Sequence, residues 1–265
     1  MQQRYLCNTQ IAVSRLGLGT VKFGRNQGVK YPEAFALPSD QDLLRLLDSA
    51  AAWGINLLDT APAYGNSEER LGKLLQGKRQ QWVIATKAGE EFINGESHFD
   101  FSPVALQHSV EHSLLRLHTD YLDVVLIHSN GEDERLIEQE GVFDTLARLK
   151  KDGKIRVFGM STKTVAGGLR TVEEADVVMV TYNPFCRDDQ AVIAAAHQQG
   201  KGVLVKKALA SGHLEQFRVS GQAGHDAVKT ALQFVLAEAG VSSLVLGTIN
   251  VEHLREAVEV VMAMS

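Results

Sequence analysis

The chain has little of what builds disulfide-bonded, metal-bound or membrane-spanning proteins. Two of its 265 residues are cysteines, Cys7 and Cys186. They are too few for a disulfide framework, and they stand at no metal-ligand spacing. No run approaches the roughly 18 to 20 apolar residues of a membrane-spanning helix, and the first five residues contain no apolar signal segment. We therefore expect a cytoplasmic protein with free thiols.

Positive charge is also scarce. The chain has 27 Lys and Arg against 32 Asp and Glu, a net charge of −5, which argues against a nucleic-acid or anionic-membrane partner. Its length suits one (β/α)8 barrel, which takes about 250 residues. No Pro/Ser-rich linker divides the sequence, so we expect a single catalytic domain over residues 1–265.

Short apolar runs alternate with helical patterns from end to end. The runs are nearly continuous in apolar residues, as expected for parallel strands covered on both faces; they lie at 16–20, 55–59, 82–87, 124–128, 157–161, 177–181, 203–206 and 243–247. The helical patterns, marked by caps and terminal glycines, lie at 39–54, 67–77, 102–117, 143–150, 164–172, 190–199, 226–239 and 251–262. Strict alternation predicts a single-domain (β/α)8 TIM barrel, with a doubly wound open sheet as the alternative.

Polar residues stand where three of the predicted strands end. Asp59, Lys87 and His128 each close an apolar run, and Tyr64 follows Asp59 by five residues. Each alone has an ordinary structural explanation, such as a salt bridge or a packed histidine. Together they fall on consecutive strand exits, which converge on one mouth of a barrel. The Lys charge would favour the phenolate and the Asp would hold the Lys, so Tyr64 could transfer a proton.

These motifs resemble those of the aldo-keto reductases. The run Asp-Thr-Ala-Pro-Ala-Tyr-Gly at 59–65 is similar to the family signature, and Lys87 and Tyr-Leu-Asp-Val-Val-Leu-Ile-His at 121–128 are similar to its second and third motifs. Later landmarks match at 159–161, 182–184 and 247–256. The resemblance implies a (β/α)8 barrel that moves a hydride between a nicotinamide and a carbonyl carbon. Tyr64 would be the general acid or base, Lys87 would lower its pKa, Asp59 would pair with Lys87, and His128 would orient the substrate oxygen.

The same resemblance implies a dinucleotide site. The nicotinamide, pyrophosphate and adenosine would lie along Gly19, Thr20, Val21, Ser161, Thr162, Met179, Lys206, Lys207, Leu209, Ser211, Gly212, Leu214, Gly247, Thr248, Asn250, His253 and Glu256. The chain departs from the family pattern at several of these. Gly247 and His253 replace the Lys and Arg that commonly hold the 2′-phosphate of NADPH, which weakens the electrostatic preference for it. Family frequency favours NADP(H), with NAD(H) as the alternative.

The loops predict an open pocket for small polar carbonyls or sugars. Phe23 and Tyr31 would form its walls, Asn130 would contact the substrate, and the irregular segment 208–224 is long enough to be functional. The resemblance implies a small-molecule carbonyl or alcohol as the partner and a monomer. We expect no metal, because no His-x-His or carboxylate cluster appears at the strand ends.

Three other functions compete with the reductase. The nearest is an NAD-dependent sugar or alcohol dehydrogenase of the same fold. A non-catalytic subunit that senses nicotinamide redox state is the second, although the complete Asp-Tyr-Lys-His set argues against it. The third is a Schiff-base aldolase that uses Lys87 or Lys206, since lysines can form such intermediates.

Overall fold

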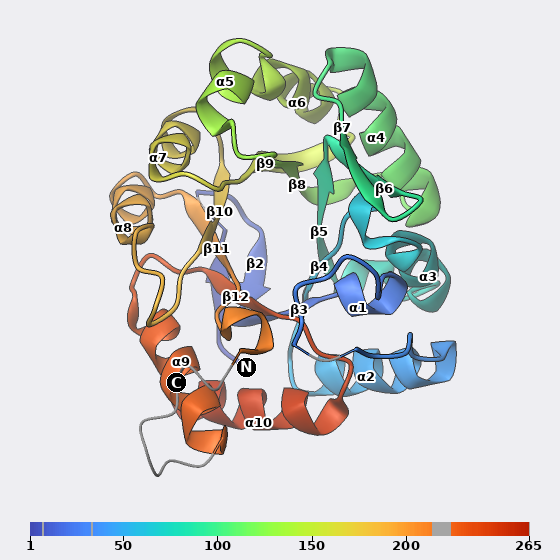
Figure 1. The fold of residues 1–265 in the computed structure, drawn as a ribbon, viewed down its shortest axis with the longest axis vertical. Coiled ribbons are helices and arrows are strands. Elements are labelled where there is room, and N and C mark those ends of the chain that lie inside the picture. The colour runs from blue at the N-terminus through green and yellow to red at the C-terminus, as the bar shows by residue number, and fades with distance from the viewer. Residues whose placement is uncertain (7, 33, 214–223, 265) are drawn as a thin grey trace.

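A closed barrel of eight parallel strands forms the centre of the molecule (Figure 1). The computed structural model describes residues 1–264 except 7, 33 and 214–223. Around the barrel the strands follow the order β10-β11-β12-β3-β4-β5-β8-β9, and β9 pairs with β10 to close it. Their bounds are β3 Leu16–Gly19, β4 Leu57–Asp59, β5 Val83–Ala88, β8 Leu122–His128, β9 Ile155–Ser161, β10 Val177–Thr181, β11 Gly202–Lys206 and β12 Ser243–Leu246.

Helices surround the barrel and cover its outer face (Figure 1). They are α1 Val21–Gly24, α2 Asp40–Ala52, α3 Ser67–Leu74, α4 Pro103–Arg116, α5 Asp133–Glu138, α6 Val142–Lys151, α7 Val165–Glu174, α8 Gln190–Gln198, α9 Gly224–Ala237 and α10 Val251–Met262. Within the described part of the chain, no helix combines the length and hydrophobicity needed to cross a bilayer. The predicted (β/α)8 barrel is confirmed, and the open-sheet alternative is wrong because the sheet closes.

The alternation of side chains along each strand decides which residues enter the barrel. Leu57, Ala85 and Leu126 belong to the apolar cluster inside it. Side chains two residues apart point to the same face of a strand. Asp59, Lys87 and His128 follow these three residues by two positions, so they continue the inward-facing rows to the carboxyl ends of β4, β5 and β8. The outward-facing residues pack against the helices as a second, larger cluster.

Two antiparallel hairpins, which the alternating pattern does not predict, are added to the barrel. The first pairs β1 (Gln3–Tyr5) with β2 (Ala12–Ser14). The second pairs β6 (Glu90–Ile93) with β7 (Glu96–Phe99) directly after β5. Its turn is Asn94–Gly95, both at positive φ, a dipeptide that strongly signals a tight hairpin. The helix bounds otherwise differ from the predicted ones by a few residues. Short turns also form in segments that were not predicted to be helical; they are α1, α5, η1 (Pro62–Tyr64), η2 (Arg79–Gln81) and η3 (Ala210–Gly212).

The contact between β9 and β10 leaves no room for a side chain at Gly159. A Cβ there would lie 1.6 Å from the carbonyl oxygen of Val177, and neither backbone can move without breaking the closing ladder. We expect Gly159→Ala to lower the free energy of unfolding by about 1–3 kcal/mol or more, measured by chemical denaturation. Gly247→Ala is the control, since a Cβ there meets only the hydroxyl of Tyr31 at 2.8 Å. Equal stability of the two variants would contradict this account.

Candidate active site

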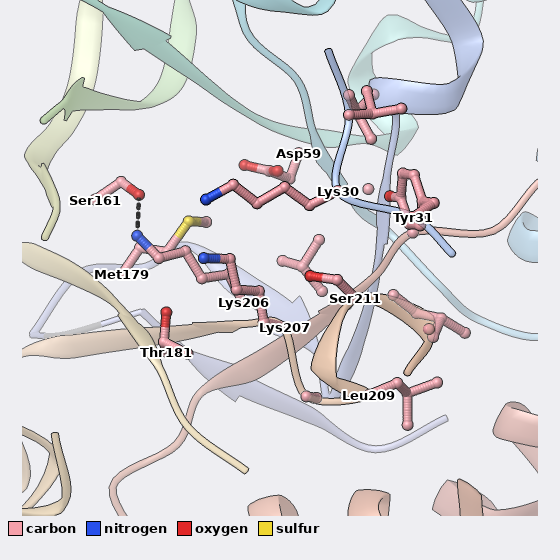
Figure 2. A pocket seen from close by; sticks show the side chains of 18 of the residues that line it. Lys30, Tyr31, Asp59, Ser161, Met179, Thr181, Lys206, Lys207, Leu209 and Ser211 are labelled. Atoms are coloured by element: carbon pink, nitrogen blue, oxygen red, sulfur yellow. Dashed lines mark hydrogen bonds between the residues drawn. The ribbon is translucent and has the colours of Figure 1, made fainter. Parts of the chain in front are cut away.

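A cavity of about 1370 Å³ opens at the carboxyl ends of the barrel strands. Side chains from many different strand exits and loops line it, among them Lys206 and Ser161 on one side and Tyr31 on the other (Figure 2). Most of the site residues expected from the sequence meet here: Gly19, Thr20, Val21, Tyr31, Asp59, Tyr64, Lys87, His128, Ser161, Thr162, Met179, Lys206, Lys207, Leu209, Ser211, Gly212, Gly247, Thr248, His253 and Glu256.

A buried ion pair joins β4 to β5 at the base of this cavity. The ammonium of Lys87 donates to Asp59 Oδ1 at 2.5 Å and to the carbonyl oxygen of Thr60 at 2.9 Å. The side chains of Lys87 and Asp59 are 2% and 7% exposed. The Lys87 Nζ also lies 4.8 Å from the ring centroid of Tyr64, so one cation is fixed between a carboxylate and a phenol.

The phenol of Tyr64 is held in its protonated form. Burial raises the pKa of Tyr64, the charge of Lys87 opposes this, and Asp59 adds to the rise. Burial by itself would lower the pKa of Lys87, but Asp59 and Tyr64 outweigh it and raise that pKa. The cationic Lys87 thus lowers the pKa of Tyr64, as the sequence analysis expects. The effect of burial is larger, so the pKa is raised overall. Tyr64 therefore carries a proton that it can donate.

His128 contacts a carboxylate that the sequence argument missed. Its Nδ1 lies 2.6 Å from Glu90 Oε2, and Ser97 Oγ donates to the other oxygen of Glu90 at 2.6 Å. Glu90 and Ser97 belong to the β6–β7 hairpin, which the Asn-Gly turn at 94–95 would have revealed. Burial would raise the pKa of Glu90, but its contacts with His128 and Ser97 lower it to about 2. Glu90 is therefore an anion beside the imidazole.

A second lysine contacts Ser161 on one side of the cavity. Lys206, at the end of β11, donates to Ser161 Oγ at 2.7 Å and to the carbonyl oxygen of Thr162 at 2.8 Å (Figure 2). Burial, together with the nearby charges of Lys207 and Lys87, lowers the pKa of Lys206 to about 7. This amine therefore sits near its titration midpoint at neutral pH.

Three loops meet at the far side of the cavity from Ser161. The hydroxyl of Tyr31, from the loop after β3, lies within 2.8 Å of where a Cβ at Gly247 would stand, and Pro32 lies against Gly212. Lys22 Nζ stacks 3.9 Å from the ring centroid of Tyr31, which holds the ring in place. The glycines at 212 and 247 thus leave room for the segment that contains Tyr31.

Three of the described residues that were expected at the site do not line the cavity. Phe23 is fully buried in the core outside the barrel, so its prediction as a pocket wall is wrong: the short helix α1 turns it inward. Asn130 bonds to Glu132 beside the cavity, and Asn250 caps α10 by accepting from the backbone of Glu252 and His253. Leu214 lies outside the described residues.

Comparison with known proteins identifies the family of this chain. The model of the aldo/keto reductase family matches residues 15–229. The chain belongs to the aldo-keto reductases. A crystal structure from Pseudomonas aeruginosa that is assigned to the same family is 46% identical, with a TM-score of 0.89 over 99% of this chain and 95% of that one.

Two curated relatives extend the comparison. The uncharacterized oxidoreductase YqkF of Bacillus subtilis (strain 168) is 27% identical, over 98% of this chain and 90% of its own length. The NADH-specific methylglyoxal reductase of Escherichia coli (strain K12) is 30% identical, over 77% of this chain and 69% of its own length. This aldo-keto reductase is an oxidoreductase that acts on carbonyl or alcohol groups, in a family that uses NAD(P)H.

The donors in the cavity suit a nicotinamide dinucleotide. Hydroxyl groups of Ser161 and Thr162 and the sulfur of Met179 lie toward the catalytic end, and cations of Lys206 and Lys207 lie nearby. The cavity continues to Gly247 and Thr248 after β12 and to His253 and Glu256 in α10. Among the described residues, no group of three or more potential His, Cys, Asp or Glu metal ligands occurs.

The amine of Lys206 offers a direct test of this electrostatic description. Because its pKa is lowered to about 7, it should become neutral and reactive just above that pH, whereas an ordinary lysine titrates at about 10.4. Competitive acetylation at a series of pH values, read by mass spectrometry, measures the midpoint, with the exposed Lys73 as internal reference. A Lys206 midpoint above about 9 would show that the pocket does not destabilise its charge.

Proposed function

We propose that this aldo-keto reductase reduces aldehydes or ketones with Tyr64 as the proton donor, and runs the reverse reaction with the same residue as base. The observation that carries the proposal is the position of Tyr64 between Lys87 and His128: Lys87 Nζ lies 4.8 Å from the Tyr64 ring centroid, and the Tyr64 and His128 rings meet edge to face at 6.2 Å. The three groups can surround one substrate oxygen.

Each residue of this set has a separate task. Tyr64 gives its proton to the carbonyl oxygen as negative charge develops there. Lys87 stabilises the phenolate that remains, and Asp59 keeps Lys87 charged and pointing at Tyr64. His128 faces the same oxygen from the other side and donates a hydrogen bond to it when the imidazole is protonated. Bound nicotinamide supplies the hydride, and the protein supplies position, proton transfer and the exclusion of water.

The cofactor would lie along the wall from β9 to α10. Ser161 and Thr162 would hold the carboxamide, and the cations of Lys206 and Lys207, with Ser211, would meet the pyrophosphate. In this arrangement Lys206 gains a negative partner, which would raise its lowered pKa. Gly247, Thr248, His253 and Glu256 would surround the adenosine.

The substrate side of the cavity is polar. The cations of Arg25 and Lys30 line it. Arg25 is fixed by the carbonyl oxygens of Ala63 and Gly28 and by stacking 3.4 Å from the ring centroid of Phe92. A small carbonyl compound with further oxygen atoms suits these donors. The methylglyoxal reductase relative acts on a substrate of this class.

Replacing Tyr64 tests the proton donor. Tyr64→Phe removes the hydroxyl and keeps the ring, so we expect kcat for an activated aromatic aldehyde to fall about 100- to 10,000-fold while NADH and NADPH still bind. Nicotinamide absorbance measures turnover, and quenching of protein fluorescence measures binding. Tyr5→Phe, on the exposed β1 strand, is the control.

The outcomes separate the competing functions. Turnover that survives in Tyr64→Phe would eliminate Tyr64 as the proton donor. Tight cofactor binding without turnover in the wild type, across aldehydes, ketones and sugars, would favour the redox-sensing subunit. Turnover only with alcohols and NAD⁺ would favour the dehydrogenase.

We further propose that the site binds NAD(H) more tightly than NADP(H), although family frequency favours NADP(H). No cation stands at Gly247, where the hydroxyl of Tyr31 takes the space. Glu256 contributes a carboxylate to the same part of the cavity, which would repel a 2′-phosphate. The NADH-specific relative is consistent with this preference.

Glu256 gives this preference a test. Glu256→Gln removes one negative charge, so we expect the Kd for NADPH to fall about fivefold, equivalent to about 1 kcal/mol, with little change for NADH. Titration calorimetry measures both. Glu259→Gln, on the exposed side of the same helix, is the matched control. Tighter binding of NADPH than of NADH by the wild type would refute the preference.

A further inference from the structure

The partner of His128 fixes more than the ring's position. Among the described residues, the carboxylate of Glu90 is the only group that meets the buried Nδ1, at 2.6 Å. A carboxylate anion can only accept hydrogen bonds, and two acceptors at this distance would repel each other. The proton of a neutral imidazole must therefore lie on Nδ1.

The carboxylate of Glu90 is held in place by its neighbours in the β6–β7 hairpin. Glu90 begins β6, three residues after Lys87, and is 9% exposed. Ser97 on β7 donates to its second oxygen at 2.6 Å, so both carboxylate oxygens are occupied. The register of the hairpin pairs Glu90 with Phe99 and Glu91 with His98, which fixes the Glu90 backbone in place.

We propose that Glu90 is a positioning residue that holds neutral His128 as the Nδ1–H tautomer, so that Nε2 faces the reaction as a hydrogen-bond acceptor. The choice of tautomer is set by what the other ring nitrogen contacts. Neutral His128 then accepts a hydrogen bond from a substrate hydroxyl, and it donates to a carbonyl oxygen only as the imidazolium. The inference deepens the function proposed above for the same site.

The burial of His128 and the charges around it set its pKa, and therefore its protonation state at neutral pH. Burial lowers the pKa of His128, Glu90 opposes this, and the ammonium groups of Lys87 and Lys206 add to the lowering. The phenol of Tyr64 also neighbours His128, its ring meeting the imidazole edge to face, and the charge of Arg25 acts on the Glu90 carboxylate. At neutral pH the imidazole is thus mostly neutral, and its tautomer decides whether it offers a proton or a lone pair.

The tautomer has a consequence for the reaction. As pH rises through the His128 titration, the ring loses its Nε2 proton, so the KM of a carbonyl substrate should rise while the KM of the corresponding alcohol falls. Without the carboxylate, the neutral ring can carry its proton on Nε2. The KM of the carbonyl should then stay constant over the same pH range.

Long-range ¹H–¹⁵N NMR of the histidine rings, recorded without cofactor or substrate, tests the proposal directly. The His128 signals are identified by their loss in His128→Asn. We expect the wild type to carry the neutral-ring proton on Nδ1, and Glu90→Met, which keeps the side-chain length and removes the acceptor, to move it to Nε2. Glu91→Met, the same change at an exposed neighbour, should leave the signals unchanged.

Several outcomes would overturn the proposal. A wild-type proton on Nε2 would do so without any variant, even if Glu90→Met failed to fold. An unchanged tautomer in folded Glu90→Met would show that Glu90 does not select it, and so would a carbonyl KM in that variant that keeps its wild-type pH dependence. Because the spectra need no turnover, a failed reductase assay would leave the tautomer result intact.

Discussion

The ion pair between Asp59 and Lys87 is the interaction on which the rest of the site depends. Both groups lie inside the barrel, where isolated charges are unstable, and each is tolerated because the other is within 2.5 Å. Removing one partner of such a pair costs about 3–5 kcal/mol. The pair therefore ties β4 to β5, and it also presents a permanent cation to Tyr64.

The other charged groups around the cavity are also held in fixed positions. The cations of Lys87 and Lys206 come from opposite sides of the barrel, from β5 and β11, and both act on His128. Glu90 supplies the nearby anion. Each group is fixed by a backbone carbonyl, a hydroxyl or a neighbouring charge, so a substrate oxygen meets an arrangement that needs little reorganisation.

The strand exits could be predicted from the sequence because parallel strands buried on both faces are continuous apolar runs, and a polar residue that ends one stands out. Asp59, Lys87 and His128 were found this way, and the family signature added Tyr64. Glu90 does not stand out in this way, because it follows β5 almost directly and belongs to a hairpin that the alternation of strands and helices does not predict. Phe23 was misplaced because periodicity does not show which way a single short turn of helix points. The far end of the cavity is built from loop contacts, such as Tyr31 against Gly247, that join residues more than 200 positions apart and leave no local pattern.

The β6–β7 hairpin places the residue that contacts His128 outside the barrel strands. The stability of the barrel core and the protonation of His128 therefore depend on different segments of the chain. The barrel strands carry Asp59, Lys87 and His128, and changes there disturb the core. The histidine's partner belongs instead to a short insertion whose outer strand is exposed along its length. Its turn and outer strand can be altered, shortened or exchanged with little effect on the closed sheet. The protonation behaviour of the active site can therefore diverge between related enzymes by exchange of one surface segment, while the barrel stays the same.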